Sequence, residues 1–333
     1  MHRSDVCSAP RSRIARPFIM SGALAVMLAI SSAFAPPVWA LAALWIANNS
    51  SNNLEVFGKK QQTITGVAHP GEVATSGSPL GIAFDRKANL WTTIGGTELQ
   101  EFTKRTLARM QRAPSPSAVV TSTSFEKLVG CNFDRAGNLW IADAAGSIHE
   151  LSATQLNAGT ALVVPAAELT APGHFVSPQF VAFDKTGNLW VSDEDANAVF
   201  EFTPNQLQSG GDEVPRVLNT GLALPGELAF DRKGNLWVAN FGAADAAEFS
   251  KSSLAGGGSP APIATIVSRN NILNGAWGLA FDQTNDLWIA NYNTGAVMKF
   301  GPAQLLMKHP LLPKVFILGA QNFAYQITFG PTP

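Results

Sequence analysis

The sequence predicts an all-β protein, a six-bladed β-propeller with four-stranded blades, on three observations. An eight-residue block recurs five times, the tryptophans of these blocks are evenly spaced, and the last segment of the chain supplies a strand that the first repeat lacks. The composition agrees, because 29 glycines and 21 prolines provide the turns that many short strands need.

The repeated block is expected to form a tight hairpin between two strands. It reads FDRKANLW at 84–91, FDRAGNLW at 133–140, FDKTGNLW at 183–190, FDRKGNLW at 230–237 and FDQTNDLW at 281–288. With Trp45 added, the successive tryptophans lie 46, 49, 50, 47 and 51 residues apart, which suits a four-stranded blade. The aspartate should cap the turn, and the residue before the asparagine should adopt positive φ, so Ala88 should be strained there.

The remainder of each repeat predicts a third strand, a rim turn and a fourth strand. Residues 199–202 are typical of the third strand and 214–218 of the fourth. Between them, the segments SATQL, TPNQL and GPAQL, at 152–156, 203–207 and 301–305, indicate single capped helical turns.

The two ends of the repeat array are expected to complete one blade. Leu44 and Trp45 match the second strand of a blade but lack a first strand before them. Residues 326–330 read QITFG, which matches the first strands GLAFD and ELAFD. The C-terminal strand therefore closes the first blade, and six blades result without a long free edge.

Phrases such as FDRKGNLWVAN and FDKTGNLWVSD resemble the NHL-repeat propellers across residues 42–333. More broadly, they resemble the six-bladed superfamily that contains gluconolactonases, related lactonases and streptogramin lyases. This resemblance implies the fold, whereas members of the superfamily act as hydrolases, lyases, ligand binders or protein-interaction platforms.

The resemblance does not carry over a known active site. Resemblance to a gluconolactonase implies a cation in the funnel, held by Glu, Asn and Asp. At the corresponding position of each blade, where the inner strand begins, none of these residue types is present. The residues there are Leu80, Val129, Gln179, Gly226, Trp277 and Tyr325. The WFTE-like blade pattern of the lyases is likewise replaced by LWIAN, LWIAD and LWVSD.

Residues 1–40 are interpreted as a signal peptide. Four arginines precede an uncharged apolar run at 18–35, and small residues allow cleavage after Ala40 or Ala42. We therefore expect an exported protein, periplasmic or extracellular, without a membrane span once cleaved. An uncleaved membrane anchor is the alternative.

The charge of the chain argues against a nucleic-acid partner, and its cysteine content argues against a disulfide or a zinc site. Loss of residues 1–40 removes four arginines and one aspartate, which moves the formal net charge from −1 to −4. A mildly acidic protein is a poor nucleic-acid binder. Cys131 falls where other repeats carry an apolar residue, so a buried thiol is expected rather than a disulfide or zinc site. We expect a monomer.

Candidate site residues gather at one mouth of the predicted channel. The second strands end in a partial polar ring of Asn48, Asp143, Asp193, Asn240 and Asn291. Such oxygen ligands would suit Ca²⁺, although Asn and Asp at strand ends also cap their own loops. The openings of the inner strands supply binding candidates for a small polar or sugar-like molecule, namely Gln179, Phe180, Trp277, Tyr325 and Gln326.

Glu227 and His174 are the candidates for acid–base chemistry at the same mouth. The sequence contains no nucleophile elbow, P-loop or HExxH helix. It therefore predicts a module that binds a small molecule or a protein through the mouth. Two alternatives stay open: a divergent lactonase, other hydrolase or lyase with a funnel site, and a structural envelope or matrix protein.

Overall fold

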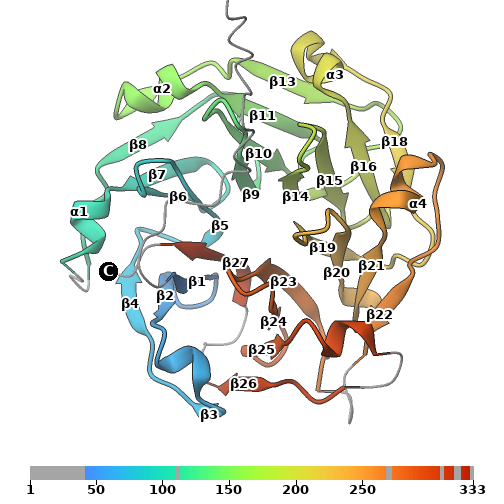
Figure 1. Ribbon diagram of the computed structural model, residues 1–333. Coiled ribbons are helices and arrows are strands. Elements are labelled where there is room, and N and C mark those ends of the chain that lie inside the picture. Colours follow the sequence, from blue (N-terminus) through green and yellow to red (C-terminus); the bar gives the residue numbers. More distant parts are fainter. Residues whose placement is uncertain (1–41, 110–112, 268–271, 308–310, 319–323, 331–333) are drawn as a thin grey trace, which may run out of the picture. The chain divides into compact units, whose positions relative to one another are not determined.

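The computed structural model describes residues 42–109, 113–267, 272–307, 311–318 and 324–330, and the predicted signal peptide lies outside them. Six sheets form blades around a common centre (Figure 1). The predicted six-bladed propeller is confirmed. Within the described ranges, no helix is both long and apolar enough to cross a membrane.

Each blade places one strand at the centre and a tryptophan-bearing second strand beside it. From blade 1 to blade 6, the inner strands are β27 (Ala324–Gly330), β5 (Pro79–Phe84), β9 (Leu128–Phe133), β14 (Pro178–Phe183), β19 (Pro225–Phe230) and β23 (Ala276–Phe281). The second strands are β1 (Ala43–Asn48), β6 (Leu90–Ile94), β10 (Leu139–Asp143), β15 (Leu189–Asp193), β20 (Leu236–Asn240) and β24 (Leu287–Asn291).

The third and fourth strands complete the blades toward the rim. The third strands are β2 (Asn53–Phe57), β7 (Glu98–Phe102), β11 (Ser147–Leu151), β16 (Ala198–Phe202), β21 (Asp245–Phe249) and β25 (Ala296–Phe300). The fourth strands are β4 (Gly71–Ala74), β8 (Ala118–Thr121), β13 (Ala167–Thr170), β18 (Arg216–Leu218), β22 (Ala264–Ile266) and β26 (Val315–Leu318).

Blade 1 is closed by the C-terminal strand, as predicted. Strand β27 pairs antiparallel with β1, with Leu44 opposite Phe329 and Ile46 opposite Ile327. In Figure 1 the red β27 accordingly lies beside the blue β1. The ring is thus joined by a sheet that combines both ends of the repeat array.

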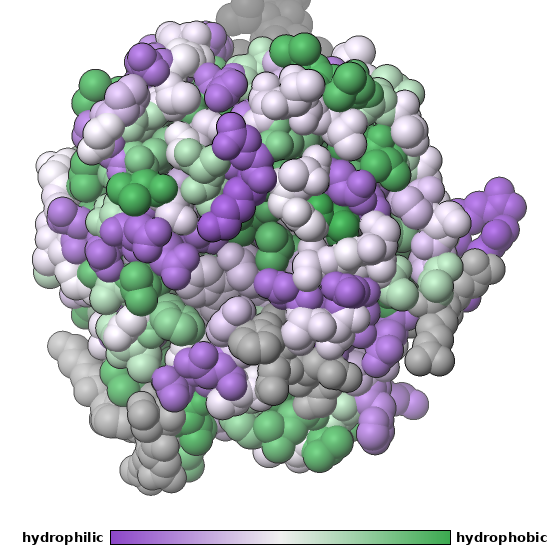
Figure 2. All heavy atoms as spheres, turned by 180° about the vertical axis from the view of Figure 1, so that it is seen from behind, coloured by the Kyte–Doolittle hydropathy of each residue, from purple (hydrophilic) through white to green (hydrophobic). Residues whose placement is uncertain are grey.

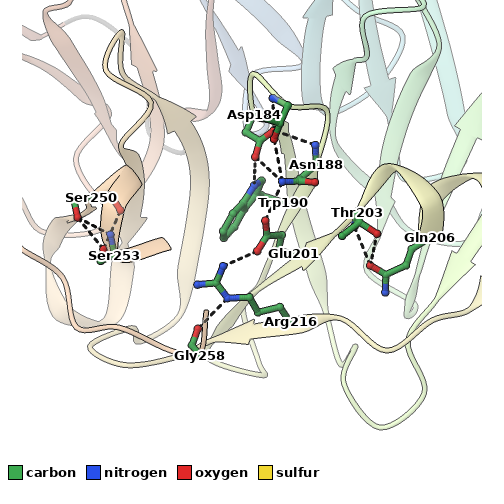
Figure 3. Close-up of polar contacts among 11 residues, drawn as sticks. Asp184, Asn188, Trp190, Glu201, Thr203, Gln206, Arg216, Ser250, Ser253 and Gly258 are labelled. Atoms are coloured by element: carbon green, nitrogen blue, oxygen red, sulfur yellow. Dashed lines mark hydrogen bonds and ion pairs between the residues drawn. The ribbon is translucent and has the colours of Figure 1, made fainter. Parts of the chain in front are cut away.

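The repeated block forms the expected hairpin, which is drawn for blade 4 in Figure 3. One oxygen of Asp184 accepts the backbone N–H groups of Thr186 and Asn188 at 2.8 and 3.0 Å, and the other accepts Trp190 Nε1 at 3.3 Å. Asn188 also donates to Glu201 on the third strand at 3.0 Å. One block therefore fixes a turn, a core tryptophan and the neighbouring strand together.

Blade 6 has a different arrangement of charges in this network. Its block has Asp286 in place of the asparagine, and Lys299 stands where blade 4 has Glu201. Lys299 Nζ lies 2.6 Å from Asp286 and 3.1 Å from Asp282, and 4.9 Å from the Trp288 ring centroid. The paired change keeps an attraction at a position where two carboxylates would repel each other.

The fifth residue of the block, predicted to have positive φ, has it in all five blocks. Glycine occupies three of these positions, whereas Ala88 has φ 65° and Asn285 has φ 61°. Left-handed backbone at alanine costs about 1 kcal/mol. This is only slightly more than the extra conformational entropy that a glycine loses when the chain folds.

Ala88→Gly is therefore expected to stabilise the protein by about 0.5 kcal/mol, measured from urea-induced unfolding. The matched reverse change is Gly187→Ala, because Gly187 has φ 91° and a Cβ there would meet only Pro204 at an ordinary 3.6 Å. It should destabilise by a similar amount. Destabilisation by Ala88→Gly would show that Ala88 is not strained.

Short helical turns connect the third and fourth strands at the perimeter (Figure 1). They are α1 (Lys104–Leu107), α2 (Ala153–Asn157), α3 (Pro204–Ser209), α4 (Lys251–Ala255), η1 (Gln61–Thr63) and η4 (Gln304–Leu306); a further turn, η2 (Phe241–Ala243), follows β20. The three predicted turns correspond to α2, α3 and η4. Ser152 and Thr203 form capping boxes at the first two.

Two-residue strands also join neighbouring blades at the rim. They pair parallel with the fourth strand of the preceding blade and are β3 (Gly66–Val67) on β26, β12 (Ala161–Leu162) on β8 and β17 (Gly211–Asp212) on β13. These pairings cover outer edges that would otherwise be open.

The block tryptophans form the contacts between blades. Trp190 lies 6.0 Å from Phe230 of the next blade, and Trp288 lies 6.0 Å from Phe329 on β27, both edge to face. Polar and apolar side chains are interspersed over the face shown in Figure 2. The buried apolar clusters each join residues of two neighbouring blades, for example Trp190 with Leu236 and Phe249.

All six inner strands have a shift in their pairing with the second strand, close to the start of the inner strand. Such bulges leave backbone groups of the ladder unpaired and redirect side chains. They lie at the end of the channel opposite the block hairpins, where the candidate site residues were expected.

Candidate functional site at the channel mouth

A cavity of about 160 Å³ opens at the mouth and is lined by Glu194, Phe241, Trp277, Tyr292 and Tyr325. Trp277 and Tyr325 come from the beginnings of β23 and β27. The other three residues each follow directly after a second strand, in blades 4, 5 and 6. The propeller therefore brings residues from four blades into one pocket.

Four aromatic rings form the walls of the pocket, and Trp277 lies among them. Its ring centroid is 5.5 Å from Tyr325, 5.6 Å from Phe241 and 6.2 Å from Tyr292. Phe180 packs below, 5.8 Å from Trp277, and is itself fully buried. Aromatic pairs at these distances attract each other beyond their burial of area, so the walls hold one another in place.

Tyr325 is held in place by Gln179, which was itself a predicted ligand-binding residue. Its hydroxyl donates to Gln179 Oε1 at 2.9 Å, and Gln179 Nε2 donates to Ser177 Oγ at 2.9 Å. Burial, and then the nearby Glu194 carboxylate, raise the pKa of Tyr325. The phenol is therefore a neutral wall with a fixed orientation.

Glu194 supplies the one carboxylate of the lining. It is partly exposed and makes no salt bridge with any residue of the described segments. Burial and then the charge of Asp195 raise its pKa, while the charge of Lys127 lowers it. The pocket thus pairs apolar ring surface with an anionic edge.

Glu227 does not line this pocket but lies buried among the inner strands at the centre of the ring. Its Oε2 accepts the backbone N–H of Leu279 on β23 at 2.7 Å and that of Ile327 on β27 at 3.2 Å. The carboxyl group therefore joins the inner strands of blades 5, 6 and 1. Burial raises its pKa to about 8, although both of these hydrogen bonds act in the opposite direction.

Gln326 continues this polar connection to the other side of the channel. Its Oε1 accepts the N–H of Ile82 on β5 at 2.7 Å, and its Nε2 donates to the carbonyl of Cys131 on β9 at 3.4 Å. Cys131 is buried, as expected, and burial raises the pKa of its thiol. Glu227 and Gln326 together satisfy backbone groups that the bulged inner strands leave unpaired.

His174 has surroundings separate from those of Glu227. It lies on the loop between β13 and β14, where its ring packs against Phe200 at 5.9 Å and its Nδ1 lies 3.2 Å from the Pro172 carbonyl. These two contacts, both within blade 4 and the loop that enters it, do not include Glu227 or a residue of the aromatic pocket. The structure thus places the two catalytic candidates in different environments.

The residues of the predicted polar ring form hydrogen bonds within their own blades and with the loops that lead into these blades. Asp193 accepts the N–H groups of Val176, Ser177 and Ala196 at 2.8–3.0 Å. The other members bond to neighbouring segments as follows: Asp143 to Glu126, Lys127, Ala145 and His149; Asn240 to Gly221, Ala223 and Asp245; Asn291 to Ile272; and Asn48 to Ser50 and Glu55.

These contacts affect the two ring carboxylates differently. Burial raises the pKa of Asp193 despite its three N–H donors. Burial also acts to raise the pKa of Asp143. The hydrogen bonds from His149 and from three backbone N–H groups outweigh it, so the pKa of Asp143 is lowered overall. Among the described residues, no three His, Cys, Asp or Glu side chains converge as metal ligands would.

The sequence-based binding candidates included Trp277 and Tyr325 but not Glu194, Phe241 or Tyr292. A signal for them was present, because each directly follows a member of the polar ring. A second signal is compositional: the chain has two tyrosines, and both line the pocket. Trp277 is also the one tryptophan after Trp45 that lies outside the block position.

No family model matches the chain, and no curated protein matches it in sequence. Solved structures do match. A Bacteroides caccae protein of unknown function has TM-score 0.62 and 12% identity, covering 88% of this chain and 100% of that one. A streptogramin B lyase has TM-score 0.54 and 15% identity, covering 76% and 74%.

A third match is a catalytically inactive variant of virginiamycin B lyase from Staphylococcus aureus, whose structure includes quinupristin. It has TM-score 0.53 and 12% identity and covers 81% of this chain and 84% of that one. At these identities the similarity establishes the fold, a six-bladed β-propeller. It does not establish the activity, which has to be inferred from the residues of the site.

Proposed function

We propose that the protein is an exported propeller that binds a small molecule in the aromatic pocket at its channel mouth. The observation that carries the proposal is the convergence of Phe241, Trp277, Tyr292 and Tyr325 beside Glu194. Apolar and aromatic walls with a few polar groups are the usual composition of ligand sites. Export is supported by the charged and apolar character of residues 1–40.

The size of the cavity favours a small ligand, or one compact group of a larger one. Pockets that enclose a drug-sized molecule measure about 300–1,000 Å³, whereas this one measures about 160 Å³. A concave site of this size also fits a small molecule better than a flat protein surface. Binding is favoured over catalysis because Glu227 is committed to two backbone N–H groups and His174 lies elsewhere.

Ligand-observed NMR with a set of small cations, sugars, carboxylic acids and neutral aromatics tests this proposal. We expect compounds that bind the wild-type protein and compete with one another for a single site. Trp277→Ala should abolish their signals. Tyr292→Ala, which changes a partly exposed residue, should weaken them and provides a second variant with less effect on folding.

Leu162→Ala is the matched control, because Leu162 is an apolar rim residue that is 72% exposed and distant in sequence from the pocket lining. It should leave binding unchanged. The proposal fails if no compound binds, or if Trp277→Ala and Tyr292→Ala leave every binding signal as it is in the wild type.

A further inference from the structure

We propose that the group held in this pocket is an alkylated ammonium ion, which contacts the rings of Trp277, Tyr292 and Tyr325 beside the carboxylate of Glu194. This inference rests on the proposed function and adds the chemical class of the ligand. Three features carry it: the angles between the rings, the charge at the mouth and the scarcity of oxygen ligands.

The rings meet at steep angles, so they form walls instead of a flat platform. The interplanar angle is 67° between Trp277 and Tyr325, 74° between Tyr292 and Tyr325, and 87° between Trp277 and Phe241. A sugar ring stacks best on one flat aromatic face. A compact, nearly spherical cation can contact several differently oriented rings at once, as in the aromatic sites that bind quaternary ammonium groups.

The charge around the pocket has the sign that such a ligand needs. Glu194 is followed by Asp195, and no Lys or Arg of the described residues is its salt-bridge partner. A bound cation would supply that partner. Cation–π contacts contribute about 0.5 to 2 kcal/mol each, with the larger values in sites shielded from water.

A bare metal ion fits the same residues poorly. Ca²⁺ takes about six to eight oxygen ligands, whereas the lining offers one carboxylate and two phenol groups. The Tyr325 hydroxyl is already bonded to Gln179. An organic cation needs no oxygen shell, because its alkyl groups lie against the rings while its charge faces Glu194.

Calorimetric titration with choline and with its neutral carbon isostere, 3,3-dimethylbutan-1-ol, tests the inference at constant ionic strength. We expect choline to bind and the neutral compound to bind at least about tenfold more weakly, a difference that corresponds to about 1.4 kcal/mol. Glu194→Gln should weaken the binding of choline at least about fivefold more than it weakens the binding of the neutral compound. Sodium chloride at the same concentration is the control for screening.

The outcomes separate this inference from the proposed function. If choline and the isostere bind equally and both are lost in Trp277→Ala, the pocket binds ligands but the inference about charge is wrong. The same conclusion follows if choline fails to bind while a sugar or another neutral compound binds through Trp277. If no compound of any class binds, both proposals fail.

Discussion

Deletion of residues 324–333 is expected to abolish cooperative folding of the propeller. The deletion removes the inner strand of blade 1, so β1 loses one of its two antiparallel partners and keeps only β2. It also removes Phe329 from Trp288, and it removes Gln326 from the N–H group of Ile82. An open ring would expose two blade faces that are otherwise packed together.

Near-ultraviolet circular dichroism and thermal unfolding measure this effect. The truncated chain should lack the tertiary signal and the sharp transition of the full chain. A synthetic peptide of residues 322–333, added in trans, should restore both in part, whereas a scrambled peptide should not. A truncated chain that melts cooperatively near the wild-type temperature would contradict closure by β27.

Glu227→Gln is expected to remove a large pH dependence of stability. The pKa of Glu227 is raised from 4.5 to about 8 in the folded protein. Between these values the folded state holds a proton that the unfolded state has released. Stability from this group is therefore fully present below the unfolded pKa, falls as pH rises through the window, and levels off above the folded pKa.

The expected change in the free energy of unfolding is on the order of 3 to 5 kcal/mol across this window. Urea unfolding of both proteins at several pH values between about 5 and 8 measures the difference between them, which removes the effect of other titrating groups. Relative to the Gln variant, the wild type should lose stability toward the higher pH. Parallel curves would show that Glu227 is not buried as described.

Glu227→Leu provides the complementary variant. It removes the acceptor, so the N–H groups of Leu279 and Ile327 lose their partner in a buried place. Each unsatisfied group costs about 1 to 3 kcal/mol, so this variant should be less stable than Glu227→Gln at every pH. Equal stability of the two variants would indicate that water reaches these N–H groups.

The fold was predictable because each repeat carries its signal locally. The aspartate and the tryptophan of one block determine a turn and a blade contact within eight residues, and the five copies reveal the period. The closure was predictable for the same reason, since QITFG matches the other inner strands. The parallel pairings of β3, β12 and β17 were not, because two-residue strands leave no pattern in the sequence.

The site was predictable where residues lie on regular strands and unpredictable where they lie on loops. Trp277 and Tyr325 begin inner strands, so their place at the mouth followed from the repeat. Glu194, Phe241 and Tyr292 lie just beyond strand ends, where the direction of a side chain depends on the loop. Sequence alone also left open whether residues such as Asp193 cap loops or bind a cation; their capping contacts became visible in the structure.

The central claim is that the mouth pocket binds an alkylated ammonium ion, and a crystal structure of the protein grown in the presence of choline tests it most directly. Our account predicts electron density for the ligand between Trp277, Tyr292 and Tyr325, with its ammonium group next to Glu194. An empty aromatic pocket, with choline bound reproducibly at another site, would contradict it.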